Sequence, residues 1–428
     1  MRFFCCFLPL LLVLGCASYT RETKLVRQYY LGGQYQKALQ SLESSSIKTE
    51  SASSLLYHLE KASILERLGE GAKSRKELMN ADRIADKLYT VSVSKTASSF
   101  LVNDRVADYE GEDYEKIAIH TMMALSFLGD KKFRSARVQA RKINTKLYEI
   151  TQGYDEKNNH YREDAFARYL AGLIYESLKE YDDAIIDYKK AISLFNSPHY
   201  RKFFLGPVPQ ELLSALYRLA KNRQRRDILS FLKKGFPEEY EEARKELRNL
   251  PSYGEVVVLH EVGKIANKYT KEFILNIGKQ VVRFSFPYIP QKHHNTFGFT
   301  GIESELGGKQ AASNVADMNA IAYQNLEDRR GRVILKSTTR LLAKGQLTEQ
   351  AYQKLGPLGG LAANVFSAVT ETADTRSWTL LPSAFYVSRV QLPPGKHVIK
   401  ITTGGKITDF PEVRVKKNSI TILRSYSD

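Results

Sequence analysis

The sequence predicts an α+β protein in which an all-α repeat half is followed by an α+β half with a β-rich end. Three observations predict this architecture. Helical patterns with small and aromatic residues at fixed offsets recur over residues 16–250, runs of β-branched residues follow Pro251, and a short apolar run stands at the N-terminus. We therefore divide the chain into residues 1–15, 16–250 and 251–428.

The first element is an apolar run from Phe3 to Leu14, preceded by the single charge of Arg2. At about 1.5 Å per helical residue the run reaches roughly 18 Å, whereas a hydrocarbon core is roughly 30 Å thick. A run of this length is typical of the apolar part of a secretory signal, so residues 1–15 are predicted to be a signal peptide.

The end of this run, Val13-Leu14-Gly15-Cys16, resembles the lipobox of bacterial lipoproteins. The resemblance implies that Cys16 receives a diacylglycerol and becomes the first residue of the mature chain. It further implies a lipid anchor in the outer membrane, with the protein facing the periplasm. The residues alone also fit an ordinary signal-peptidase site that releases a soluble protein.

Composition narrows the range of partners. The chain carries a formal net charge of +17 at pH 7, which favours anionic partners such as lipid head groups, glycans or acidic proteins. We expect no nucleic acid, because an exported protein rarely meets it. Cleavage would remove Cys5 and Cys6 and leave only Cys16, so we expect no internal disulfide.

The clearest repeat unit spans Ala167–Phe195 and resembles a tetratricopeptide repeat (TPR). In such a repeat two antiparallel helices cross closely, which explains a glycine in the first helix and alanines in the second. The pattern residues are Gly172, Tyr175, Tyr181, Ala184, Tyr188 and Ala191. Weaker copies at Leu31–Leu42, Leu65–Ala81 and Phe127–Ile143 predict three to five repeats, because a continuous core needs at least three.

The second half alternates strands with a helical hairpin. After Pro251, the stretch "EVVVLHEVG" is typical of a buried strand, and "QVVRFSFPYIP" predicts a second strand. Residues 315–372 show a helical pattern that predicts a hairpin. Beyond Asp374 four strand patterns follow one another, separated by turns such as Pro393-Pro394-Gly395.

Three stretches together resemble a family of bacterial lipoproteins with a TPR-like N-terminal half. They are Tyr109–Leu128, Val256–Lys264 and Glu371–Ile399, in this order. The resemblance covers most of the mature chain and implies its architecture. It implies no activity, no cofactor and no catalytic residue.

Motifs that suggest catalysis are incomplete. "HEVGK" from His260 lacks the second histidine of a zinc-protease helix and has the pattern of a strand, and His293-His294 has no spaced carboxylate partner. Ser92–Lys95 matches an SxxK pair without its companion motifs, and Gly307–Gln310 is not a P-loop. We therefore predict that the chain binds no metal and no cofactor and is not an enzyme.

The stretch "ADTRSW" carries the only tryptophan. Asp374 and Arg376 flank Trp378 closely, and such pairs hold loops rigidly. The interpretations are a structural lock where the chain returns to strand, or a corner that binds a partner. The candidate partner-binding residues are Tyr175, Tyr181, Tyr188, Asp374, Arg376 and Trp378.

Two features of the predicted hairpin each have two interpretations, one structural and one in binding. Arg332, Lys336, Arg340 and Lys344 share one helix face, which is either solvated or docks on anionic lipid. The apolar stretch Leu355–Val369 is either an internal contact or a site of oligomerisation or membrane insertion.

These observations favour a non-enzymatic envelope lipoprotein that scaffolds or regulates an envelope assembly. We expect the repeat half to offer a concave surface to envelope proteins or peptides. The first alternative is an enzyme or ligand-binding protein with a site around Asp374, Arg376 and His260. The second is a homo-oligomer formed through the hairpin, residues Val333–Val369.

Overall fold

The computed structural model describes residues 19–94, 107–152, 161, 163–200, 203, 206–249, 253–277, 280–290, 300–304, 308–330, 353 and 373–427. Several positions that the sequence singles out lie outside these residues. They are Cys16, Lys95, His293, His294, Arg332, Lys336, Arg340, Lys344 and Leu355–Val369.

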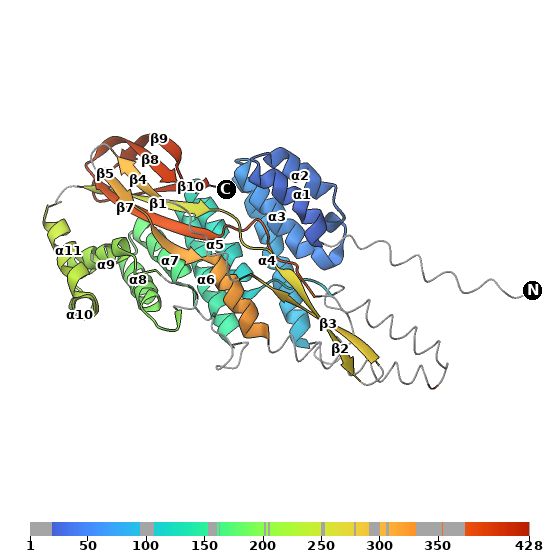
Figure 1. Cartoon of the computed structure of the whole chain (residues 1–428). Coiled ribbons are helices and arrows are strands. Elements are labelled where there is room, and N and C mark those ends of the chain that lie inside the picture. The colour runs from blue at the N-terminus through green and yellow to red at the C-terminus, as the bar shows by residue number, and fades with distance from the viewer. Residues whose placement is uncertain are drawn as a thin grey trace, which may run out of the picture.

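The N-terminal part of the described chain consists of helices joined by short turns (Figure 1). The helices are α1 (Tyr19–Leu31), α2 (Tyr35–Glu43), α3 (Ser54–Arg67), α4 (Gly71–Ser94), α5 (Asp113–Gly129), α6 (Phe133–Gln152), α7 (Ala165–Ser177), α8 (Tyr181–Phe195), α9 (Gln210–Asn222), α10 (Arg226–Gly235) and α11 (Pro237–Asn249). Up to α10 they pack as consecutive pairs, α1 with α2 and so on, which confirms the predicted helical repeat.

The same turn closes every pair. The second of its three linking residues has a positive φ, which reverses the chain within a few residues. These residues are Gly33, Gly69, Lys131, Lys179 and Gln224, with φ between 56° and 77°. Their common position shows that the weak sequence copies are true structural repeats, although lysine and glutamine replace glycine in the later ones.

In the part of the chain that the structure describes, ten strands follow the helical half, and one further helical stretch, residues 318–330, lies between β6 and β7. A central four-stranded sheet has the order β10-β1-β7-β6, in which β1 pairs with β10 in parallel and with β7 antiparallel. Their bounds are β1 (Gly254–Val262), β6 (Ser313–Asp317), β7 (Ala384–Leu392) and β10 (Ile420–Ser427). The strand predicted from "EVVVLHEVG" is therefore confirmed at the centre of this sheet.

An outer sheet and a separate hairpin complete the strands. The outer sheet has the order β5-β4-β8-β9, and β2 pairs only with β3 among the described residues. Their bounds are β2 (Tyr269–Ile277), β3 (Gln280–Tyr288), β4 (Thr300–Ser304), β5 (Gly308–Ala311), β8 (Gly395–Thr403) and β9 (Lys406–Val415). The short strands β4, β5 and β6 were not predicted from the sequence.

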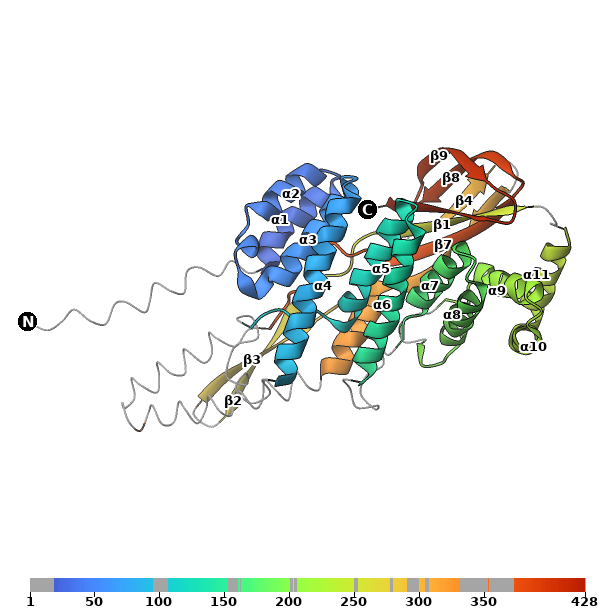
Figure 2. The same cartoon turned by 180° about the vertical axis from the view of Figure 1, so that it is seen from behind.

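The molecule has three layers, with helices on one face of the central sheet and the outer sheet on the other (Figures 1 and 2). Strand β1 is buried along its whole length because it lies between both layers. Val257 and Leu259 belong to the core shared with the helices, whereas Val256 and Val258 pack against the outer sheet. This explains why β1 is a continuous apolar run rather than an alternating one.

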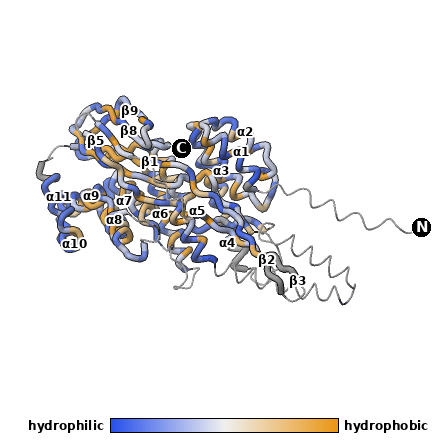
Figure 3. Tube along the Cα trace, in the orientation of Figure 1, coloured by the Kyte–Doolittle hydropathy of each residue, from blue (hydrophilic) through white to orange (hydrophobic). Residues whose placement is uncertain are grey.

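The helical half and the central sheet share one hydrophobic core. Helix α7 contacts β7 through Phe166 and Phe385, whose rings stack with centroids 4.7 Å apart. In α5 and α7 nearly every residue is buried, because each helix lies between its partner helix and the sheet. Figure 3 shows the apolar stretches gathered where helices and strands meet. The predicted regions 16–250 and 251–428 are thus not built around separate cores.

The predicted helical hairpin begins later than expected. Residues up to Asp317 form strand β6, and residues 318–330 are helical. The rest of the hairpin lies outside the described residues. Within the described part of the chain, no helix combines the length and the apolar character needed to cross a bilayer.

The close crossing of α7 and α8 gives a first test. A Cβ atom on Gly172 would lie 2.4 Å from the Tyr188 ring, so Gly172→Ala should destabilise the fold by about 1–3 kcal/mol. Gly235, at the end of α10, has open space around it, and Gly235→Ala should change stability by less than about 0.5 kcal/mol. Urea unfolding measures both values, and equal effects would contradict the close crossing.

Candidate functional site

The first helices of the repeats, which were expected to offer a surface to a partner, are covered by the chain itself. Residues Ala373–Leu381, here called the crossing segment, pass over the first helices of the repeats before entering β7. The backbone amide of Trp378 donates to Glu115 Oε1 over 2.7 Å. The amides of Thr379 and Leu380 donate to Glu60 over 2.6 and 3.1 Å. Carboxylates on α3 and α5 therefore bind this segment as they would bind a peptide.

Side chains of the crossing segment point into the core. The Trp378 indole nitrogen donates to Ser63 Oγ over 2.9 Å, and the ring is almost completely buried. Arg376 forms two bonds to Asp374, of 2.9 and 2.8 Å, and donates to the Ala52 and Ala107 carbonyls. Both side chains are buried, which favours a structural lock, and a role of Arg376 and Trp378 in binding a partner stays a prediction.

Helix α1 also forms hydrogen bonds to the crossing segment and to Glu60. The Tyr19 hydroxyl lies 2.7 Å from Glu60 Oε1 and 2.8 Å from the Ser377 carbonyl oxygen. Arg27 donates to the carbonyls of Thr379 and Ile265. Burial raises the pKa of Glu60 to about 7, and the hydrogen bonds it accepts act in the opposite direction.

A second buried network joins α7 to the sheet. Arg389 on β7 pairs with Glu176 at 3.0 Å and with Glu255 at 2.8 Å. The Tyr188 hydroxyl donates to Glu176 over 2.6 Å. Arg218 on α9 pairs with the same two carboxylates, so each buried charge has an opposite neighbour.

The three candidate tyrosines of the repeat have different surroundings. Tyr188 is fully buried in the network just described, and Tyr175 is also buried. Their spacing therefore reflects packing between helices, and a role of these two in binding a partner stays a prediction. Tyr181 is half-buried at the start of α8, with the Arg223 guanidinium 5.9 Å from its ring centroid. Only Tyr181 of the three keeps a side chain at the surface.

His260 belongs to a different environment. It lies on β1, with Nε2 2.7 Å from Thr403 Oγ1 on the outer sheet. The next residue, Glu261, points to the opposite face and pairs with Arg67 and Arg424. Burial lowers the pKa of His260 to about 4, so the imidazole is neutral at pH 7. His260 and Arg376 thus contact different parts of the chain rather than one common site.

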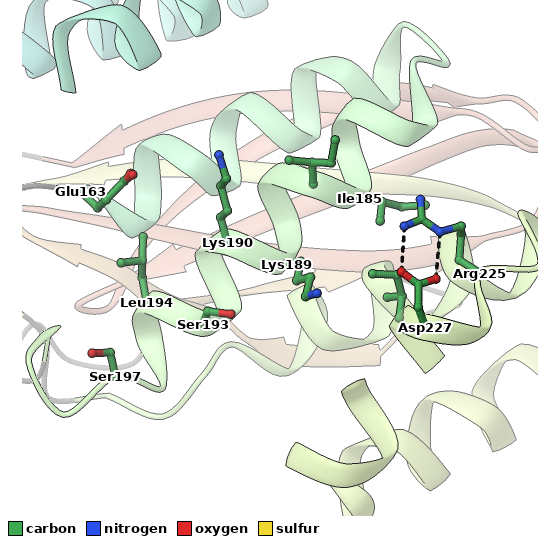
Figure 4. A pocket seen from close by; sticks show the side chains of 11 residues that line it. Glu163, Ile185, Lys189, Lys190, Ser193, Leu194, Ser197, Arg225 and Asp227 are labelled. Carbon is green, nitrogen blue, oxygen red and sulfur yellow. Dashed lines mark hydrogen bonds and ion pairs between the residues drawn. The ribbon is translucent and has the colours of Figure 1, made fainter. Parts of the chain in front are cut away.

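An open groove lies at the far end of the repeats, between α8 and α10 (Figure 4). Its volume is about 620 Å³. Ile185, Leu194 and Ile228 form the apolar floor, and Ile186 at the edge is 50% exposed. We call it the α8–α10 groove.

The rim of the α8–α10 groove is basic. Lys189 and Lys190 are exposed along α8. Arg225 is neutralised by two hydrogen bonds of 2.9 Å to Asp227, drawn in Figure 4. Glu163 also lines the groove, and its carboxylate pairs with Arg168. The two lysines therefore leave an excess of positive charge beside an apolar surface, the pattern that suits an acidic and apolar segment of another protein.

Neither a family model nor a curated relative matches the chain. Solved structures similar to it include TPR-like repeats of a Podospora anserina kinesin light chain, with 14% identity and a TM-score of 0.32 over 53% of this chain and 95% of that one. MamA shares 12% identity with a TM-score of 0.31, covering 54% and 94%. PilF of Pseudomonas aeruginosa shares 18% with a TM-score of 0.23, covering 53% and 96%. Scores of this size support no argument about function.

The lock gives a second test. Glu60→Ala removes the acceptor of the Thr379 and Leu380 amides and should cost about 2–4 kcal/mol, because buried donors lose their partner. Hydrogen exchange of these two amides should become much faster. The exposed Asp409 is a matched control, and Asp409→Ala should leave their exchange unchanged. Unchanged protection in the Glu60 variant would contradict the lock.

His260 gives a pH test. An unfolded histidine titrates near 6.5, whereas the folded pKa is about 4, so the unfolded state binds more protons between these values. Wild-type stability should therefore lose up to about 3 kcal/mol from this residue as the pH falls from 6.5 to 4. The stability difference between wild type and His260→Gln, followed by urea unfolding, isolates this contribution. A difference independent of pH would contradict the buried neutral imidazole.

Proposed function

We propose that this protein is a lipid-anchored scaffold of the bacterial cell envelope that binds a protein partner through the α8–α10 groove. The observation that carries the proposal is the contrast between two surfaces of the helical repeats. The crossing segment covers the first helices α3 and α5 with its own backbone, whereas the α8–α10 groove keeps an apolar floor and a basic rim in contact with solvent.

The chemistry of the α8–α10 groove selects the partner. Burying Ile186 and the neighbouring floor would gain roughly 25 cal/mol per Å² of apolar surface. Lys189 and Lys190 would meet carboxylates at the edge and exclude basic segments. The fitting occupant is an amphipathic segment with acidic residues beside its apolar face, which lies along the groove as a helix or strand.

The membrane part of the proposal depends on Cys16. The lipobox resemblance supports it, and transfer of two acyl chains into a bilayer is sufficient for stable anchoring. Palmitate labelling of wild type and Cys16→Ser tests it. We expect label only in the wild type, together with recovery of that protein in the outer-membrane fraction. Equal labelling or equal recovery of both would refute the anchor.

A photo-crosslinking amino acid at Ser193, in the groove, tests the partner site. In cells it should give one discrete adduct, and Ile186→Asp should reduce the adduct at least several-fold because a buried unpaired charge opposes docking. Ile407 on β9 is similarly exposed, so Ile407→Asp is the control and should leave the adduct intact. The site is wrong if both variants keep the adduct, or if both lose it.

A further inference from the structure

The β2–β3 hairpin carries exposed aromatic rings on one face. Tyr269, Phe273 and Tyr288 are 46%, 40% and 36% exposed, although large aromatic side chains are normally well covered. The rings contact each other in pairs. Phe273 stacks on Phe286 with centroids 5.5 Å apart, and Tyr269 lies 6.0 Å from Tyr288. Phe286 itself is buried. We call the three exposed rings, together with the buried Phe286 on which Phe273 stacks, the aromatic patch.

The strand register explains why the rings share a face. Tyr269 lies directly opposite Tyr288, and Lys271 directly opposite Phe286, so alternate residues of both strands point the same way. The intervening positions nearest the patch hold Thr270 and Glu272 on β2 and Ser285 and Pro287 on β3, so the rings lie on one face only. The hairpin projects from the main body in both views (Figures 1 and 2).

Cations accompany the aromatic patch. The Lys271 ammonium lies 5.5 Å from the Phe273 ring centroid. The Arg330 guanidinium lies 5.2 Å from the Phe286 ring centroid and also pairs with Glu327 at 3.1 Å, so Lys271 is the main cation of the patch. Tyrosine and phenylalanine rings beside lysine and arginine are the residue types enriched where a protein meets a membrane interface. Aromatic bodies enter the boundary between head groups and acyl chains, while the cations contact phosphates.

The start of α1 lies next to this patch. Tyr19, Lys24 and Tyr269 line one cavity of about 510 Å³, so the first described residue is a neighbour of the hairpin. Residue 16 precedes Tyr19 by three positions, and an extended chain covers at most about 11 Å over that interval. An acyl anchor on Cys16 would therefore hold a bilayer close to the aromatic patch. This step rests on the proposed function.

We propose that the aromatic patch, with Lys271 and Arg330, is a second membrane contact that docks on the head-group region of an anionic bilayer. One lipid-modified residue alone leaves the protein free to tumble about the anchor. A second contact fixes its orientation. Because α8 and α10 lie at the opposite end of the molecule from the β2–β3 hairpin in both views, this orientation points the α8–α10 groove away from the membrane (Figures 1 and 2).

The test places a photo-crosslinking amino acid at one position of the full chain, bound to vesicles of phosphatidylethanolamine and phosphatidylglycerol. Phe273 and Tyr269 are the test positions, and the exposed Tyr148 and Ile407 are the controls. Mass spectrometry should find phospholipid adducts several-fold more abundant at the test positions than at the controls. Lys271→Glu should lower the yield at Phe273, because it replaces attraction to phosphate by repulsion.

Equal phospholipid adducts at all four positions would overturn the inference. Adducts of Phe273 to a second copy of the chain, or to another protein in cells, would overturn it as well and would assign the patch to that partner. The mass of the N-terminal peptide reports lipid on Cys16 independently. An unmodified Cys16 with phospholipid adducts retained at Phe273 would refute the anchor while supporting the second membrane contact.

Discussion

Two buried carboxylates, Glu60 and Glu115, hold the backbone of the crossing segment against the first helices of the repeats, and the rest of the structure depends on this interaction. A buried carboxylate is costly unless donors surround it, and helical amides nearby are already used within their own helices. Trp378, Thr379 and Leu380 supply the missing donors. The helical half is therefore incomplete without the C-terminal half, and the segment that completes it also positions β7 and, through β7, the central sheet.

Local patterns predicted the elements well, and they predicted the contacts between distant elements poorly. The spacing of Gly172, Ala184 and Tyr188 identified a helix pair, because each of these residues packs against the partner helix of its own repeat. The same residues could not show that the opposite face of α7 is covered, since that cover comes from a strand more than two hundred positions later. In the sequence, nothing distinguishes Glu60 from a glutamate exposed to solvent. The one sequence feature that indicates such burial, and that the predictions did not use, is the apolar character of α5 on all its faces, which indicates a helix buried on both sides.

This arrangement changes where binding is to be sought. A solenoid is expected to bind partners through the inner helices of its repeats, yet here those helices are covered by residues of the same chain. Two of the three candidate tyrosines, Tyr175 and Tyr188, are buried in the core. Two surfaces of the described residues are proposed for binding, the α8–α10 groove at one end and the aromatic patch at the other. A groove with an apolar floor and basic rim suits a protein segment, and exposed rings with a cation suit lipid. If both proposals hold, the protein is a scaffold held in one orientation on a membrane.

The central claim is that the helical repeats need the crossing segment and sheet in order to fold. The most direct measurement is the unfolding of a chain that ends at residue 250, followed by circular dichroism in urea beside the full-length protein. The truncated chain should associate through the uncovered faces of α3, α5 and α7, and its unfolding in urea should show no cooperative transition. A truncated monomer with native helix content and a sharp transition would contradict it, because the repeats would then form a complete domain without their cover.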